Sequence, residues 1–244
     1  MGKVGQPGEL LQEFHVGHAE LELKRSIVGL MMFEAQYQQH PIPAEGGVVK
    51  RAWMRYYDEP PAEIEFTLIS WDTASTLGED ADWSVGTVWG VAAGEFYLLD
   101  VIRGQFEAPG LRHRIEALHR QYEADKTLIE DDGVGRAIVQ DLRRISPWCM
   151  PQLVKPRYEK LARMEARAVM FETGKVLVPT AAPWLGTYLD ELLSFPNSAK
   201  DDQVDSTSQA LDYLQQRFAA TLRGRPNPKR RAKGGPRPPG SPRR

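Results

Sequence analysis

Between residues 63 and 103, apolar and β-branched residues gather in short runs of the kind that form β-strands. The runs cover residues 64–71, 84–91 and 95–102. Only the small residues 92–94 separate the second run from the third, which favours a tight hairpin. We therefore expect three consecutive antiparallel strands.

Beyond residue 108 the apolar positions recur every three or four residues, which is the spacing of helices, and short apolar strands interrupt this pattern. The elements predicted in this part are helix 109–122, strand 127–130, helix 135–145, strand 152–154, and helices 159–172, 183–194 and 202–218. The order β-β-β-α-β-α-β builds a mixed five-stranded sheet flanked by helices, an α/β fold of the RNase H-like type. In this arrangement the first strand is central and lies beside the fourth.

The two ends of the chain differ from this central part. Residues 18–39 have helical character, and the prolines and glycines of HPIPAEGG then end the helix. From residue 219 the chain is rich in Pro, Gly and Arg and has too few apolar residues to fold alone. We therefore divide the chain into an N-terminal helix and linker (1–62), an RNase H-like domain (63–218) and a disordered basic tail (219–244).

Charge is distributed unevenly along the chain. All 33 acidic residues precede Arg217, whereas ten of the 31 basic residues lie from Arg217 onward. A cationic arm of this kind can neutralise the phosphates of double-stranded DNA, and we assign Arg230 and Arg231 to that contact. A purely solubilising tail is the alternative. The sequence has no apolar run of membrane-spanning length and no signal peptide, so we expect a cytoplasmic protein, and the single cysteine, Cys149, excludes an internal disulfide.

Acidic residues stand where the predicted topology would bring them together. Asp72 follows the first strand and Glu130 ends the fourth, while Asp201, Asp202 and Asp205 open the last helix. Like charges gathered at one end of a sheet repel each other unless cations bridge them. Two Mg²⁺ or Mn²⁺ ions would supply that charge and could hydrolyse a phosphodiester bond, one ion activating water and the other stabilising the leaving oxygen.

Taken singly, each acid has an ordinary structural explanation, because Asp after a strand forms turns and Asp before a helix caps it. Strand alternation turns residue 131 away from the face that Glu130 uses, so Glu130 is the better ligand. Asp202 and Asp205 share a helical face, and either Asp201 or Asp202 could be the third ligand.

Several motifs, in order, make residues 18–216 resemble the C-terminal region of phage terminase large subunits. They are the linker-like EAQYQQHPIPAEGGVVKRAWMRYYD, then ISWDTA, DWSV at 82–85, FYLLDVIRG, LIEDDGVGRAIVQDLR, FETGKVLVP, APWL and DDQVDSTSQAL. The resemblance implies an endodeoxyribonuclease that cuts concatemeric phage DNA during packaging into the procapsid, in the cytoplasm of the bacterial host. It also implies a terminase ATPase domain, a small terminase subunit and a portal protein as partners.

The resemblance further implies roles for individual residues. Asp72, Glu130 and one acid of the Asp201 and Asp202 pair would bind the metal ions, with Asp205 close by. We assign Asp72, Glu130 and Asp202 as catalytic, and Asp82 would support the site. Lys160 and Arg163, on a helix after the fifth strand, would contact DNA phosphates; a solvated pair is the alternative.

One departure from the family is the lack of a GxxxxGK[ST] phosphate-binding loop, so this chain has no ATPase motif of its own. A resolvase- or transposase-type nuclease of the same fold would use similar acids. From another class, a non-catalytic packaging factor that binds DNA or a portal would use the acids only as helix caps.

Overall fold

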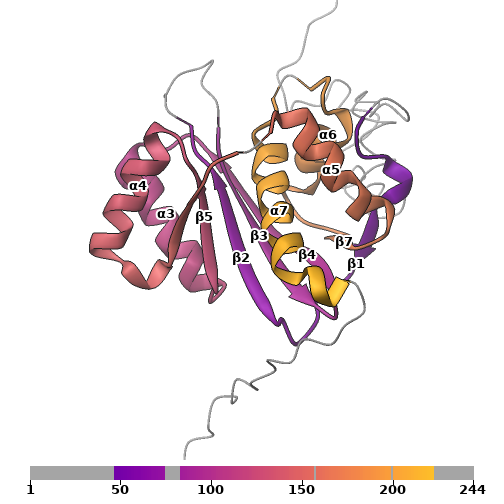
Figure 1. Cartoon of the computed structure of the whole chain (residues 1–244), viewed down its shortest axis with the longest axis horizontal. Helices are drawn as coiled ribbons and strands as arrows, with labels where there is room; N and C mark the ends of the chain where they lie inside the picture. The colour runs from indigo at the N-terminus through magenta and orange to yellow at the C-terminus, as the bar shows by residue number, and fades with distance from the viewer. Residues whose placement is uncertain (1–46, 75–82, 157, 199, 223–244) are drawn as a thin grey trace, which may run out of the picture.

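The computed structural model describes residues 47–74, 83–156, 158–198 and 200–222, and a mixed seven-stranded sheet runs through them (Figure 1). The strands are β1 (Arg55–Tyr57), β2 (Phe66–Asp72), β3 (Ser84–Ala92), β4 (Glu95–Gly104), β5 (Lys126–Glu130), β6 (Pro151–Val154) and β7 (Val176–Pro179). Their order in the sheet is β1-β7-β4-β3-β2-β5-β6. The helices are α3 (Ala108–Gln121), α4 (Gly133–Ile145), α5 (Lys160–Glu172), α6 (Leu185–Ser194) and α7 (Asp202–Leu222).

The centre of the sheet confirms the predicted topology. Strands β2, β3 and β4 form an antiparallel meander, and β2 pairs in parallel with β5 from Leu68↔Lys126 to Trp71↔Ile129. The first and fourth predicted strands are therefore neighbours. The hairpin between β3 and β4 has a two-residue loop, in which Ala93 (φ 51°) and Gly94 (φ 76°) both adopt the left-handed conformation that such short loops require.

The prediction of five strands is wrong, because β1 and β7 extend the sheet beyond β4. Strand β7 pairs in parallel with both β4 and β1, so Arg55–Tyr57 joins the sheet although it lies within the segment predicted as a linker. These two strands are three and four residues long, and their own apolar pattern is too short to identify them. The predicted helix 18–39 lies outside the described residues, as does the predicted tail apart from residues 219–222, which continue helix α7 instead of being disordered.

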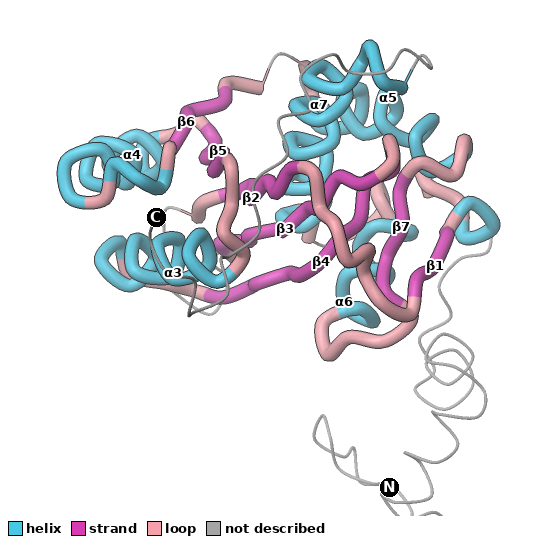
Figure 2. The backbone as a smooth tube through the Cα atoms, turned by 90° about the horizontal axis from the view of Figure 1, so that it is seen from below, coloured by secondary structure: helices cyan, strands magenta, loops and turns pink. Residues whose placement is uncertain are grey.

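Helices cover both faces of the sheet, as predicted (Figure 2). Consecutive residues of β2 alternate between the faces: Leu68 belongs to the core shared with α5, α6 and α7, whereas Ile69 and Trp71 belong to the core shared with α3 and α4. The sheet is thus buried on both sides, and only the ends of its strands are open for chemistry. Of the helices described, none is both long and apolar enough to cross a membrane.

Candidate acidic site at the carboxyl ends of β2 and β5

Two of the predicted site residues end neighbouring parallel strands. Asp72 is the last residue of β2 and Glu130 the last residue of β5, so both lie at the same end of the sheet. Helix α7 crosses β2 and β3, where the Ser206 hydroxyl donates a hydrogen bond to the Ser70 carbonyl oxygen (2.8 Å). This contact brings the first turn of α7, with its buried Asp202 and Asp205, to the same place.

The carboxylates of Asp72, Glu130, Asp202 and Asp205, which we call the acidic cluster, are electrostatic neighbours. Burial, followed by the charges of Asp205, Glu130 and Asp202, raises the pKa of Asp72 well above its ordinary value. Burial and the Asp205 charge raise the pKa of Glu130. The fold therefore collects negative charge that water does not fully solvate, which is the electrostatic signature of many functional sites.

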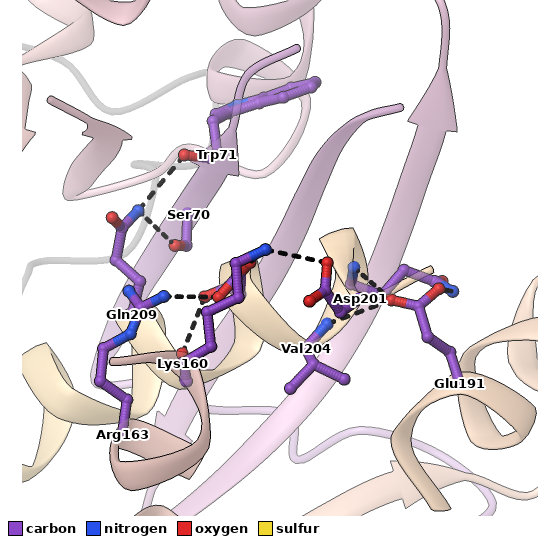
Figure 3. A network of polar contacts seen from close by, with 11 residues as sticks. Ser70, Trp71, Lys160, Arg163, Glu191, Asp201, Val204 and Gln209 are labelled. Atoms are coloured by element: carbon purple, nitrogen blue, oxygen red, sulfur yellow. Dashed lines mark hydrogen bonds and ion pairs between the residues drawn. The ribbon is translucent and has the colours of Figure 1, made fainter. Parts of the chain in front are cut away.

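Two basic side chains of α5 neutralise part of the acidic cluster (Figure 3). The ammonium nitrogen of Lys160 lies 2.5 Å from Asp205 Oδ2 and 2.9 Å from Asp201 Oδ1, and Arg163 Nη2 lies 2.5 Å from Asp205 Oδ1. Burial lowers the pKa of Lys160, but its hydrogen bonds to Asp205 and Asp201 outweigh this and raise the pKa above its ordinary value. Burial raises the pKa of Asp205 in spite of both cations. Both residues predicted to contact phosphate thus lie beside the predicted metal ligands.

The acids next to Glu130 have local structural partners. Asp131 Oδ1 accepts a hydrogen bond from Arg136 Nε (2.5 Å). Asp132 is the N-cap of α4, since its Oδ1 accepts hydrogen bonds from the Gly135 backbone nitrogen (2.5 Å) and the Thr73 hydroxyl (3.1 Å). This N-terminal turn packs tightly on β5, because a Cβ atom at Gly135 would lie 2.1 Å from the Glu130 carbonyl oxygen.

Two residues that the sequence did not single out individually hold α7 in place. Glu191 of α6 accepts hydrogen bonds from the backbone nitrogens of Gln203 (2.6 Å) and Val204 (3.3 Å), and from Gln203 Nε2 (2.6 Å). Burial raises the pKa of Glu191, although the bonds from Gln203 oppose this. Gln209 Nε2 donates to Ser70 Oγ (2.9 Å) and lies 3.3 Å from the Trp71 carbonyl oxygen (Figure 3).

The acidic cluster offers carboxylate oxygens, the ligand type that Mg²⁺ and Mn²⁺ prefer. Across the described ranges, however, no three His, Cys, Asp or Glu side chains already form a group that could hold a metal ion. Instead, ion pairs with Lys160 and Arg163 neutralise the negative charge of Asp205. The carboxylate oxygens of the acidic cluster therefore suit a divalent cation. In this structure, however, Lys160 and Arg163 neutralise part of their charge.

The sheet order and the helices on both faces define a protein of the RNase H-like class. Residues 69–214, more than half of the chain, match the terminase RNase H-like domain family, and the chain belongs to this family. No curated protein matches the sequence.

Solved structures of large terminases share the fold. The magnesium-bound large terminase nuclease of thermophilic phage G20c aligns with a TM-score of 0.52 at 19% identity, over 70% of this chain and 98% of that one. Its cobalt-bound form gives a TM-score of 0.51 at the same identity and coverage. The large terminase of a second thermophilic bacteriophage aligns with a TM-score of 0.52 at 12% identity, over 82% of this chain but only 52% of that one. At these identities the likeness establishes the fold, and the chain spans about half of the second phage's protein.

The predicted site residues thus divide into three groups. Asp72, Glu130, Asp202 and Asp205 form the acidic cluster, and Asp201 lies at its rim, bound to Lys160. Lys160 and Arg163 both form ion pairs with the cluster, Lys160 from a half-exposed side chain and Arg163 from a largely buried one. Asp82, Arg230 and Arg231 lie outside the described residues.

Proposed function

We propose that this chain is a metal-dependent endodeoxyribonuclease that cuts concatemeric phage DNA during packaging into the procapsid. The observation that carries the proposal is the acidic cluster, which gathers carboxylates from two strand ends and one helix into mutual repulsion. A fold gains no stability from such repulsion, so the arrangement is explained by a cationic ligand. The family membership and the metal-bound G20c nuclease support this reading.

In this proposal Asp72, Glu130 and Asp202 would hold two Mg²⁺ or Mn²⁺ ions, and Asp205 and Asp201 would be further oxygen donors. Bound ions of this kind activate a water molecule and stabilise the leaving oxygen of a phosphodiester. Asp205 becomes available once Lys160 and Arg163 release it. The two freed cations then stand beside the cut phosphate and bind its oxygens, as predicted from the sequence.

Plasmid nicking tests this function directly. Wild-type protein is expected to convert supercoiled plasmid to nicked and linear forms in Mn²⁺, and EDTA is expected to abolish cutting without unfolding the protein. Asp72→Asn keeps the size of the side chain but removes its charge, so cutting should fall by about a thousandfold or more. Asp131→Asn is the matched control, because Asp131 pairs with Arg136 and should be dispensable. Cutting by Asp72→Asn at the wild-type rate would overturn the proposal.

The partners follow from the same proposal. The substrate is double-stranded DNA, bound in the host cytoplasm and also contacted by Arg230 and Arg231 of the basic tail. We propose that a terminase ATPase domain works with this chain, together with a small terminase subunit and a portal protein, because the chain belongs to the terminase RNase H-like family and aligns with 52% of a phage large terminase.

A non-catalytic DNA- or portal-binding factor is the second candidate. The ion pairs of Asp205 with Lys160 and Arg163 favour it, because they neutralise the acid without any metal. This candidate predicts DNA binding that is insensitive to EDTA and no nicking in Mn²⁺, so the plasmid assay separates the two functions.

A further inference from the structure

A pocket of about 850 Å³ opens next to the acidic cluster, between β6, the residues that follow it, α5 and α7. Its polar lining includes Gln152, Lys155, Arg163, Arg167, Gln209 and Asp212. Arg163 connects the pocket to the acidic cluster, since it lines the pocket and also forms an ion pair with Asp205. The pocket is therefore continuous with the acidic cluster.

Three of the lining residues carry buried polar atoms without a hydrogen-bond partner. Arg163 Nε, Arg167 Nε and Gln209 Oε1 are buried and have no hydrogen-bond partner among the described residues. Gln209 is only 4% exposed, so water has little access to its carbonyl oxygen. Buried polar groups of this kind are normally paired, so three of them among the residues that line one pocket mark its surroundings as a polar site.

The charges of the pocket favour an anionic ligand. Lys155, Arg163 and Arg167 are cationic, against a single carboxylate, Asp212. That carboxylate is already engaged, because its Oδ1 lies 3.3 Å from Arg167 Nη1 and its Oδ2 accepts a hydrogen bond from Gln216 (2.7 Å). Arg163 is likewise paired with Asp205, so an incoming phosphate would meet Lys155 together with these two ion pairs.

We propose that this pocket binds one unpaired nucleotide of the DNA strand whose neighbouring phosphate lies at the acidic cluster. The proposal rests on the proposed nuclease function. An amide side chain such as Gln152 suits the donor and acceptor edge of a base, and the cations suit its phosphate. The volume is in the range of small-ligand pockets and accommodates a nucleotide. A base can enter only after it leaves the duplex, so the site favours DNA that is locally melted beside the cut.

Base burial can be followed separately from cutting. The probe is a single-stranded pentanucleotide, thymidylate with 2-aminopurine at its centre, titrated in EDTA into the full chain. We expect a saturable change in 2-aminopurine fluorescence. Ala166→Trp fills the pocket from an exposed lining position on α5 and should weaken binding about tenfold or more. Leu161→Trp, at an exposed position of α5 outside the pocket, is the control and should stay within about twofold.

A second variant guards against a folding artefact. Gln152→Leu keeps the size of the side chain but removes its hydrogen bonds, and should weaken binding about tenfold, the equivalent of one hydrogen bond. No fluorescence change with wild-type protein, or equal affinities for wild type and Ala166→Trp, would overturn the pocket assignment.

Cutting then separates this proposal from the proposed function. On a duplex with a short mismatched bubble, wild-type protein in Mn²⁺ should cut faster than on the fully paired duplex, and Ala166→Trp should lose this preference. Equal cutting of both duplexes by wild type and variant would refute the pocket and leave the nuclease intact. Saturable base binding without any cutting would refute the nuclease and leave a nucleotide pocket.

Discussion

Glu191 gives the sharpest prediction about how the acidic cluster is built. This carboxylate of α6 is 7% exposed and accepts three hydrogen bonds from the first turn of α7, two of them from backbone nitrogens. The first turn of a helix has backbone donors without intrahelical partners, so Glu191 acts as a cap supplied by another helix. The same turn carries Asp202 and Asp205. Removing the cap should therefore loosen the acidic cluster as well as the fold.

The magnitude follows from these bonds. Loss of a capping side chain costs about 1 kcal/mol, and each buried donor left unsatisfied adds about 1 kcal/mol or more. We expect Glu191→Ala to lower the free energy of unfolding by about 3 kcal/mol, which for a domain of this size lowers the Tm by about 6–12 °C. Glu191→Gln should cost less, since the amide oxygen still accepts a bond and no buried charge remains.

Urea unfolding followed by circular dichroism measures the stability, and Mn²⁺-dependent nicking measures the site. Glu165→Ala, at an exposed position of α5, is the control and should change stability by no more than about 0.5 kcal/mol. The reasoning is refuted if Glu191→Ala is as stable as wild type, or if it loses stability while nicking per folded molecule stays unchanged.

Three further predictions follow from the site and the tail. Asp72→Asn should raise the Tm in EDTA at pH 7, because the folded-state pKa of Asp72 is raised and the folded protein therefore loses stability as pH rises from 3.8 through that pKa. The increase in Tm, about 2–4 °C for each kcal/mol of repulsion removed, should vanish below pH 3.8. A Tm of Asp72→Asn below that of wild type at pH 7 would contradict the prediction. Gly135→Ala should cost about 2 kcal/mol or more in urea unfolding and reduce nicking, since its Cβ would press on the Glu130 carbonyl oxygen; wild-type stability would show that the contact relaxes. Truncation after Leu222 removes nine basic residues and should weaken plasmid binding and flatten its salt dependence; an unchanged salt slope in a filter-binding assay would exclude the tail as a DNA contact.

The centre of the fold could be predicted because its information is local. Three consecutive strands form an antiparallel meander, and a helical crossover then places β5 beside β2. Strands β1 and β7 have only three or four residues, a length at which the apolar pattern identified β6 but missed these two. Such short strands are determined by the neighbours with which they pair rather than by their own pattern.

The candidate site, too, could be predicted in part from the sequence. The positions of Asp72 and Glu130 at strand ends follow from the topology. Asp132 is the N-cap of α4, a common role for an Asp that precedes a helix. The contacts between helices could not be predicted. The ion pairs of Lys160 with Asp201 and Asp205 join α5 to the start of α7. Such contacts depend on how the helices pack on the sheet, which no single segment encodes.

A crystal structure of the chain soaked in Mn²⁺, with the ions located by anomalous scattering, tests whether the acidic cluster binds metal ions. We expect two ions at the acidic cluster, with carboxylate oxygens of Asp72, Glu130 and an acid of α7 about 2.1 Å from them. Lys160 and Arg163 should then have moved off Asp205. Ions bound only elsewhere, or a cluster that stays paired with Lys160 and Arg163 at saturating Mn²⁺, would contradict the account.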